Sequence, residues 1–180
     1  MEFCKAFKRI CLIFLINSIV FLRFGYAATY YMSTTGKDTN PGTESAPWLT
    51  LSRALPAMSG GDTLIIEDGI YKGAKNRIGV YDGAVLPPTG SPGAWTTIRA
   101  RNDGGVVFDG ENARWMFYVT HNGKMTNHYW KFQGLTWGRT TDSTVFIDDS
   151  AYVKFINCGA YDAPGTANYV NFSLRATTIF

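Results

Sequence analysis

The sequence predicts an all-β fold, a right-handed parallel β-helix of about three coils with a short N-terminal capping helix. Two observations indicate this: strand-like segments that repeat at a period in the twenties, and 19 glycines without long helical periodicity. Coils of this length cannot bury their inner faces alone, so they stack on one another. A length of 180 residues suits one domain.

The clearest repeat aligns the sequence WKFQGL, which begins at Trp130, with VKFINC, which begins at Val153. Apolar residues coincide at the first and third positions, as expected for a strand with one buried face. Lys131 coincides with Lys154, and both should point outward. The fifth position is glycine or asparagine, the types that best tolerate a positive φ, so a corner is expected there.

Further strands of the same sheet are expected at related offsets. A longer offset, extended by one loop, leads back from Trp130 to Thr97 and then again to Leu64. The shorter offset, counted forward from positions 153–155, reaches positions 176–178. A loop rich in proline and glycine explains the longer spacing. Second and third strands of the coils are expected at positions 106–110, 115–119, 144–148 and 168–172.

Residues 48–58 predict a short amphipathic helix. Thr50 is a suitable N-cap, and Leu51 and Leu55 lie one turn apart on one face. Pro56 should end or kink the helix. Laid across the open end of the solenoid, this helix would cover strand edges that could otherwise pair with another chain.

The pattern of residues 1–27 predicts a secretory signal peptide that is cleaved near Ala27. Residues 28–180 would then form the β-helix. The mature protein is expected outside the cell or in the periplasm. A basic start precedes an apolar run, Ile10 to Leu22, and small residues stand at the cleavage site. A membrane anchor is the alternative, but the run is shorter than the ~20 residues that a span needs. No membrane association is expected after cleavage.

Charge and cysteine content narrow the function classes further. The signal segment holds four basic residues and one acidic residue, so its removal lowers Lys+Arg from 17 to 13 and Asp+Glu from 14 to 13. The mature chain is therefore neutral, and nucleic acid is not an expected partner. Cys158 stays as a single cysteine, so stability must come from stacked coils rather than from a disulfide within the chain.

Several short motifs together resemble the N-terminal module of secreted bacterial proteins of the pectate-lyase-like superfamily. They are Tyr30-Tyr31-Met32-Ser33, Asp38-Thr39-Asn40-Pro41-Gly42-Thr43, Pro47-Trp48-Leu49-Thr50-Leu51, Gly61-Asp62-Thr63, Asp68-Gly69-Ile70-Tyr71 and Trp95-Thr96-Thr97-Ile98-Arg99-Ala100. That superfamily includes polysaccharide lyases that act on pectin, alginate and chondroitin. The resemblance implies an acidic polysaccharide as partner and Ca²⁺ as a cofactor candidate, although no cofactor motif is evident in the residues themselves.

A lyase of this type needs a cation to neutralise the substrate carboxylate and a base, often Lys or Arg, to take the neighbouring proton. Metal candidates are Asp148, Asp149 and Asp162, because Ca²⁺ prefers carboxylate oxygens. Adjacent strand residues point to opposite faces, so the first two of these acids would make a poor metal-binding pair and suit a corner better. Substrate candidates are Lys131 and Lys154, which could form a basic strip for an anionic glycan or simply keep the sheet face soluble.

Four tryptophans are candidate platforms for sugar rings, or fill the inner stack: Trp95, Trp115, Trp130 and Trp137. His121 and His128 lie in a polar stretch without metal-site spacing, so structural or solvent roles are expected. No catalytic residue can be assigned.

The sequence ends within an apolar strand, at positions 177–180, without a polar capping repeat. We therefore expect the front part of a longer protein, whose catalytic residues lie on later coils. The expected function is lyase-like binding of an acidic polysaccharide of the pectate or alginate type. The alternatives are a non-catalytic glycan-binding or surface module and an inactive truncated product.

Overall fold

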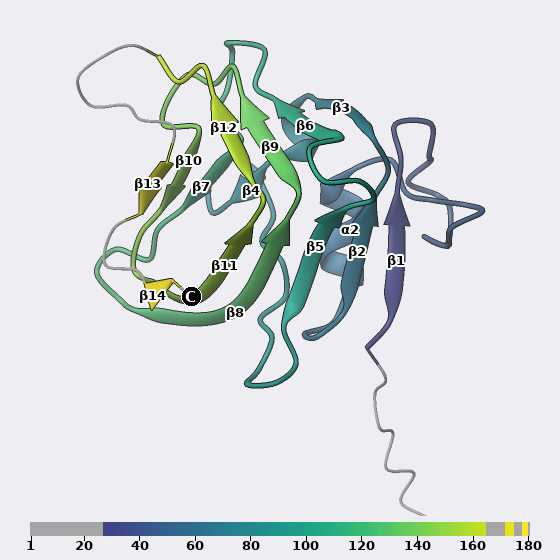
Figure 1. The fold of residues 1–180 in the computed structure, drawn as a ribbon, viewed down its shortest axis with the longest axis horizontal. Helices are drawn as coiled ribbons and strands as arrows, with labels where there is room; N and C mark the ends of the chain where they lie inside the picture. Colours follow the sequence, from purple (N-terminus) through teal and green to yellow (C-terminus); the bar gives the residue numbers. More distant parts are fainter. Residues whose placement is uncertain (1–26, 165–171, 175–177, 180) are drawn as a thin grey trace, which may run out of the picture.

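The computed structural model describes residues 27–164, 172–174, 178 and 179. Three parallel sheets wind around one apolar core, with β1 at one end of the stack and β11 and β14 at the other (Figure 1). All pairings between the named strands are parallel. The predicted right-handed parallel β-helix is confirmed.

The strands fall into the three sheets in a regular order. The first sheet contains β1 (Thr29–Met32), β2 (Thr63–Ile66), β5 (Thr96–Ala100), β8 (Thr126–Gln133), β11 (Ser150–Ile156) and β14 (Thr178–Ile179). The second contains β3 (Gly69–Lys72), β6 (Val106–Asp109), β9 (Leu135–Gly138) and β12 (Gly159–Tyr161). The third contains β4 (Ile78–Gly79), β7 (Phe117–Val119), β10 (Val145–Ile147) and β13 (Phe172–Leu174).

Each coil passes once through every sheet, which confirms the expected three-strand repeat. Within the described residues four such triplets follow one another, beginning at β2, β5, β8 and β11. The sequence predicted about three, because β3 and the very short strand β4 carry too little alternation to be recognised. The strands expected at 106–110, 115–119 and 144–148 are confirmed. Of the strand expected at 168–172, only Phe172 is described, and it is the first residue of β13. Residues 168–171 lie outside the described part.

The repeat that aligns Trp130 with Val153 is confirmed residue by residue. Lys154 pairs with Lys131, and Phe155 pairs with Phe132. The longer offset was wrong by one position, because Trp130 pairs with Thr96 rather than with Thr97. A slip of one residue exchanges the two faces of a strand, so the correct register places inward side chains on inward side chains.

The forward extrapolation from Val153 to position 176 was also wrong. Val153 pairs with Ile179, three positions further along the chain than expected. The pairing of β12 with β9 keeps the shorter offset, whereas the pairing of β13 with β10 is more widely spaced in the sequence. The additional residues therefore enter between Tyr161 and Phe172. Loops on this side of a coil vary in length without disturbing the stacked strands.

Gly134 and Asn157 occupy the predicted corner in successive coils. Their φ angles are 69° and 51°, so both have a left-handed backbone. An ideal Cβ on Gly134 would lie 2.8 Å from the backbone Cα of Asp103, so glycine is required there for space as well. The side-chain amide of Asn157 donates a hydrogen bond to the Asp103 carboxylate. The corner turns the chain from the first sheet into the second.

Inward side chains form ladders that hold the coils together. The central ladder of the first sheet runs through Leu64, Ile98, Phe132 and Phe155. The rings of Phe132 and Phe155 stack with centroids 5.3 Å apart. Full burial of each such side chain contributes roughly 1.5–3 kcal/mol, so the ladders are a main source of stability in the described part of the chain, where Cys158 is a free thiol.

The capping helix α2 spans Leu51–Ala57, shorter than the expected 48–58. Thr50 is its N-cap and accepts a hydrogen bond from the backbone N–H of Arg53. Leu51 and Leu55 are buried in the common core, which confirms the predicted apolar face. Pro56 lies inside the helix, which ends at the next residue because proline cannot continue the backbone hydrogen bonds.

Asp38 organises the start of this helix. Its carboxylate accepts hydrogen bonds from the backbone N–H groups of Leu49 and Thr50 and from the Thr50 hydroxyl. The predicted signal peptide lies outside the described residues, except for Ala27 at its end. In the part of the chain that is described, no helix is long and apolar enough to cross a membrane.

Candidate functional site

The two substrate candidates, Lys131 and Lys154, lie side by side on the outer face of the first sheet. Their register continues to Thr97 on β5, so three adjacent strands present one outward row. Neighbouring strands lie ~4.8 Å apart, and like charges directly opposite one another repel. Neither lysine forms an ion pair with a described residue. An anion bound between them would relieve this repulsion.

A half-buried indole lies beside the lysines. The Nζ atom of Lys154 is 4.2 Å from the centroid of the Trp95 ring, a cation–π contact that holds the side chain over the loop before β5. Both lysines and Trp95 line a hollow of about 380 Å³, together with Ala27, Gly61, Gly93, Ala94 and Thr97. Cationic groups and an aromatic ring therefore border one solvent-accessible hollow.

Two stacked tyrosines extend this surface. Tyr129 and Tyr152 have ring centroids 4.4 Å apart and nearly parallel planes, and Trp95 meets Tyr129 edge-on at 5.5 Å. Burial first, and Tyr152 second, raise the pKa of Tyr129. Both tyrosines have positive φ angles, 51° and 58°, which turn their rings outward beside the strand. We call Trp95, Tyr129, Lys131, Tyr152 and Lys154 the lysine–aromatic surface.

The sequence analysis missed these tyrosines. They are separated by the same offset as the two lysines, and each directly precedes its aligned segment. Extending the repeat backwards by one position would have aligned Tyr129 with Tyr152. Their left-handed backbone was not predictable, because tyrosine rarely adopts it.

The acidic candidates are not brought together. Asp148 accepts a hydrogen bond from the backbone N–H of Asp149 at 2.9 Å, and Asp149 accepts one from the backbone N–H of Gly123. These two acids therefore form a corner. Asp162 lines a separate hollow of about 590 Å³ together with Asn112, Thr140, Thr141, Ala163 and Pro164.

Calcium requires several oxygen ligands around one point. Among the residues described, no group of three or more His, Cys, Asp or Glu side chains could hold a metal ion. Asp148, Asp149 and Asp162 therefore do not fit a calcium site in this part of the chain, and no chemical step is derived through such an ion.

The tryptophan candidates divide into two classes. Trp130 and Trp137 are fully buried, with 1% and 0% exposure, and belong to the inner stack. Trp95 and Trp115 are half-buried and reach the surface. The two inner indoles join the aromatic ladder, where Trp137 stacks on Phe108 at 6.0 Å. Of these four, only the outer pair can contact a ligand.

The histidines form a structural pair. His128 is buried and stacks on Trp130 with centroids 3.7 Å apart. Its Nε2 lies 3.0 Å from Nε2 of His121. Burial, and secondarily the charge of His121, lower the pKa of His128 to about 4. A ring that stays neutral at physiological pH suits the expected structural role.

A further charged cluster is structural. Asp109, with 4% of its side chain exposed, forms ion pairs with Arg139 and, at 3.9 Å, with Lys72. Burial acts to raise its pKa, but hydrogen bonds from Arg139 and the backbone of Glu111 hold that pKa below its usual value. These residues come from three coils, so nothing in the local sequence indicated the cluster.

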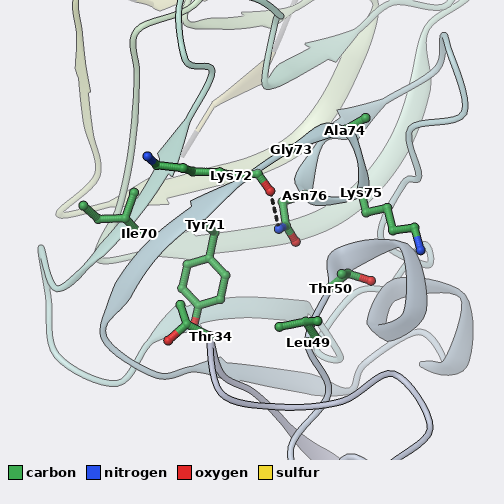
Figure 2. A pocket seen from close by; sticks show the side chains of 10 residues that line it. All are labelled: Thr34, Leu49, Thr50, Ile70, Tyr71, Lys72, Gly73, Ala74, Lys75 and Asn76. Carbon is green, nitrogen blue, oxygen red and sulfur yellow. Dashed lines mark hydrogen bonds between the residues drawn. The ribbon is translucent and has the colours of Figure 1, made fainter.

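A pocket of about 320 Å³ lies where α2 meets the first coil (Figure 2). Asn76 at its centre accepts a hydrogen bond from the backbone N–H of Leu51 and donates one to the carbonyl of Lys72. Figure 2 shows the amino groups of Lys72 and Lys75 pointing to opposite sides. Because this buried amide connects the start of α2 with the end of β3, the pocket is a structural junction rather than the candidate site.

Comparisons with known proteins agree with this architecture. The structure of pectate lyase Pel9A matches with a TM-score of 0.62 and 24% identity over 84% of this chain. The chain spans 38% of the length of that protein. A rhamnogalacturonan lyase matches with a TM-score of 0.39 and 16% identity, over 86% of this chain and 63% of its own. A search of curated proteins found no match.

The family model described as the Pel9A-like, right handed beta helix region matches residues 30–180. That range contains all the named strands from β2 onward, both lysines and the surrounding aromatic side chains. The chain belongs to the Pel9A-like right-handed β-helix family.

Proposed function

We propose that this chain binds acidic polysaccharide on the lysine–aromatic surface, as the first coils of a secreted, lyase-like β-helix. The observation that supports it most is the pairing of Lys131 with Lys154 beside Trp95. Lysine ammonium groups attract uronate carboxylates, and aromatic rings offer apolar faces to sugar rings. The similarity to a protein named as a pectate lyase supports the same substrate class.

The proposed role of the described residues is binding rather than bond cleavage. Elimination needs a base close to the acidified C–H bond and a group that neutralises the substrate carboxylate. The two lysines could meet the second need. The described acids do not assemble as cation ligands, so cleavage by this chain alone is not part of the proposal. A surface module without glycan affinity is the competing function.

Isothermal titration with oligogalacturonate and oligoalginate tests this proposal. The double variant Lys131→Gln/Lys154→Gln should weaken binding at least tenfold, because two charge-assisted contacts are lost. The matched control is Lys37→Gln/Lys124→Gln, which removes two exposed lysines elsewhere and should leave affinity nearly unchanged. Binding of the wild type should also weaken as salt is raised.

Three outcomes would contradict the proposal. Equal losses in both double variants would mean that net charge, not this surface, attracts the glycan. Absence of binding to either acidic oligomer would leave the non-binding surface module as the better function. Ultraviolet absorbance of the unsaturated product, followed with added Ca²⁺, detects cleavage separately; cleavage that persists in Lys131→Gln/Lys154→Gln would contradict the role given to this surface.

A further inference from the structure

A second aromatic hollow lies on the side of the third sheet. Tyr81, Asp82, Trp115, Tyr118 and Asp142 line a space of about 280 Å³. They come from the loop after β4, from β7 and the residues before it, and from the loop before β10. The lysine–aromatic surface belongs to the first sheet, so the two hollows share no residue. This volume is close to the lower end of the roughly 300–1,000 Å³ typical of small-ligand pockets.

Trp115 is held in a fixed position in this hollow. Its Nε1 donates a hydrogen bond to the Asp82 carboxylate at 3.3 Å, and the guanidinium of Arg77 lies 4.4 Å from its ring centroid. An ideal Cβ on Gly79 would lie 2.7 Å from the indole, so the ring occupies space that only glycine leaves open. The indole is thus preorganised, which lowers the entropy lost when a ligand binds.

Arg77, whose guanidinium packs against the Trp115 ring, is itself held in place. Its side chain is only 8% exposed, yet its charge is balanced by Asp82 at 3.7 Å, and it donates a hydrogen bond to the Asp82 carbonyl. Asp82 itself has a φ of 52°, a conformation that these contacts maintain. A buried charge and a strained backbone both favour the placement of Trp115, which indicates a built feature rather than a chance surface aromatic.

Two tyrosines complete the aromatic wall. The ring of Tyr118 lies 5.9 Å from that of Trp115 and 5.8 Å from that of Tyr81. Tyr118 also stacks on Phe146 with centroids 4.5 Å apart and an interplanar angle of 12°. Tyr81 is 45% exposed, so this wall presents apolar area to solvent that a ligand could bury.

The chemistry of the hollow selects an uncharged sugar. Aromatic faces pack against the C–H groups of a pyranose ring, and carboxylate oxygens accept hydrogen bonds from its hydroxyls. The carboxylate of Asp142 would repel a uronate, whereas the charge of Asp82 is already balanced by Arg77. We propose that Tyr81, Trp115, Tyr118, Asp82 and Asp142 form a binding site for a neutral glycosyl unit, separate from the lysine–aromatic surface.

Titration calorimetry of the purified protein with cellohexaose and xylohexaose tests this site, because their equatorially substituted rings expose C–H groups on both faces. At least one of these probes should bind. Trp115→Ala should weaken binding at least tenfold, and Tyr81→Ala, an exposed position that is safe for folding, severalfold. Tyr161→Ala, at an exposed tyrosine of β12 in the second sheet, is the matched control and should bind these neutral probes as the wild type does.

Three outcomes would overturn the proposal: no heat with either probe, equal affinity in Tyr81→Ala and the wild type, or tighter binding of oligogalacturonate than of the neutral probes by the Lys131→Gln/Lys154→Gln variant, in which this hollow is intact. Because the lysine variants above leave the neutral site intact, failure here is distinguishable from failure of the acidic-glycan proposal. Asp142→Asn adds a further check, since it should improve tolerance of acidic sugars while keeping an acceptor.

Discussion

Acidification should destabilise the protein through His128. The pKa of this buried ring is lowered from 6.5 to about 4, by burial first and by the charge of His121 second. Below about pH 6.5 the unfolded chain takes up a proton that the folded chain binds only near pH 4. The stability that the neutral His128 contributes is therefore fully present above pH 6.5, the pKa in the unfolded chain. It is lost as the pH falls from there towards about 4, the pKa in the folded chain.

The expected loss is about 2 kcal/mol between pH ~7.5 and pH ~5, because each unit of pKa difference corresponds to about 1.36 kcal/mol. His128→Phe provides the comparison. It keeps a ring against Trp130 and removes Nδ1, which has no hydrogen-bond partner among the described residues. The chain has two histidines, so this variant leaves only His121.

Urea unfolding, followed by tryptophan fluorescence at several pH values, measures this difference. The wild type should lose about 2 kcal/mol more than His128→Phe over the same pH interval. Carboxylates titrate in both proteins and cancel in the comparison. Parallel pH profiles for the two proteins would refute the assignment of a neutral, buried His128.

Two other substitutions test the corner and the start of the β-helix. Gly134→Ala should destabilise the fold by about 2 kcal/mol or more, because a left-handed backbone disfavours a side chain by roughly 1–2 kcal/mol and the new Cβ would contact the backbone of Asp103. Thermal unfolding measures this loss. It should be smaller for the control Gly123→Ala, because nothing lies within 4 Å of a Cβ at that position. The backbone nitrogen of Ala28 lies 2.8 Å from the Asp62 carboxylate, and in a chain that begins at Ala28 it would be an ammonium group. Asp62→Asn should therefore destabilise that chain by about 1–2 kcal/mol, and a chain that begins at Ala27 by less. Urea unfolding of both chains measures the difference.

The fold could be predicted because its information is local and repeated. A strand with alternating apolar residues followed by a corner occurs twice at the same spacing, and both copies form with the predicted register. Strand β4, Ile78–Gly79, is too short for any periodicity. Its existence depends on pairing with β7, in which Ile78 meets Phe117 of the next coil. Such a strand is defined by its neighbour rather than by its own sequence.

The candidate site was less predictable because residues distant in sequence build it. Lys131 and Lys154 were found through the repeat, whereas Trp95 joins them from a loop of the preceding coil. Trp95 and Trp115 could not be separated from the two buried indoles by composition. Their difference comes from position: Trp130 and Trp137 stand inside strands β8 and β9, and the outer pair precedes β5 and β7.

Where two coils share a one-residue corner, that corner defines their register better than apolar positions do. The error of one position at Trp130 arose because Thr96 and Thr97 are identical in type, so alternation alone could not decide which faces inward. Gly134 and its counterpart Asn157 allow no such ambiguity between β8 and β11, since a positive φ is tolerated by few residue types and both strands end at this corner. No such corner could correct the pairing of β5 with β8, because residues 101–105 separate β5 from β6 and the positive φ there lies at Gly104.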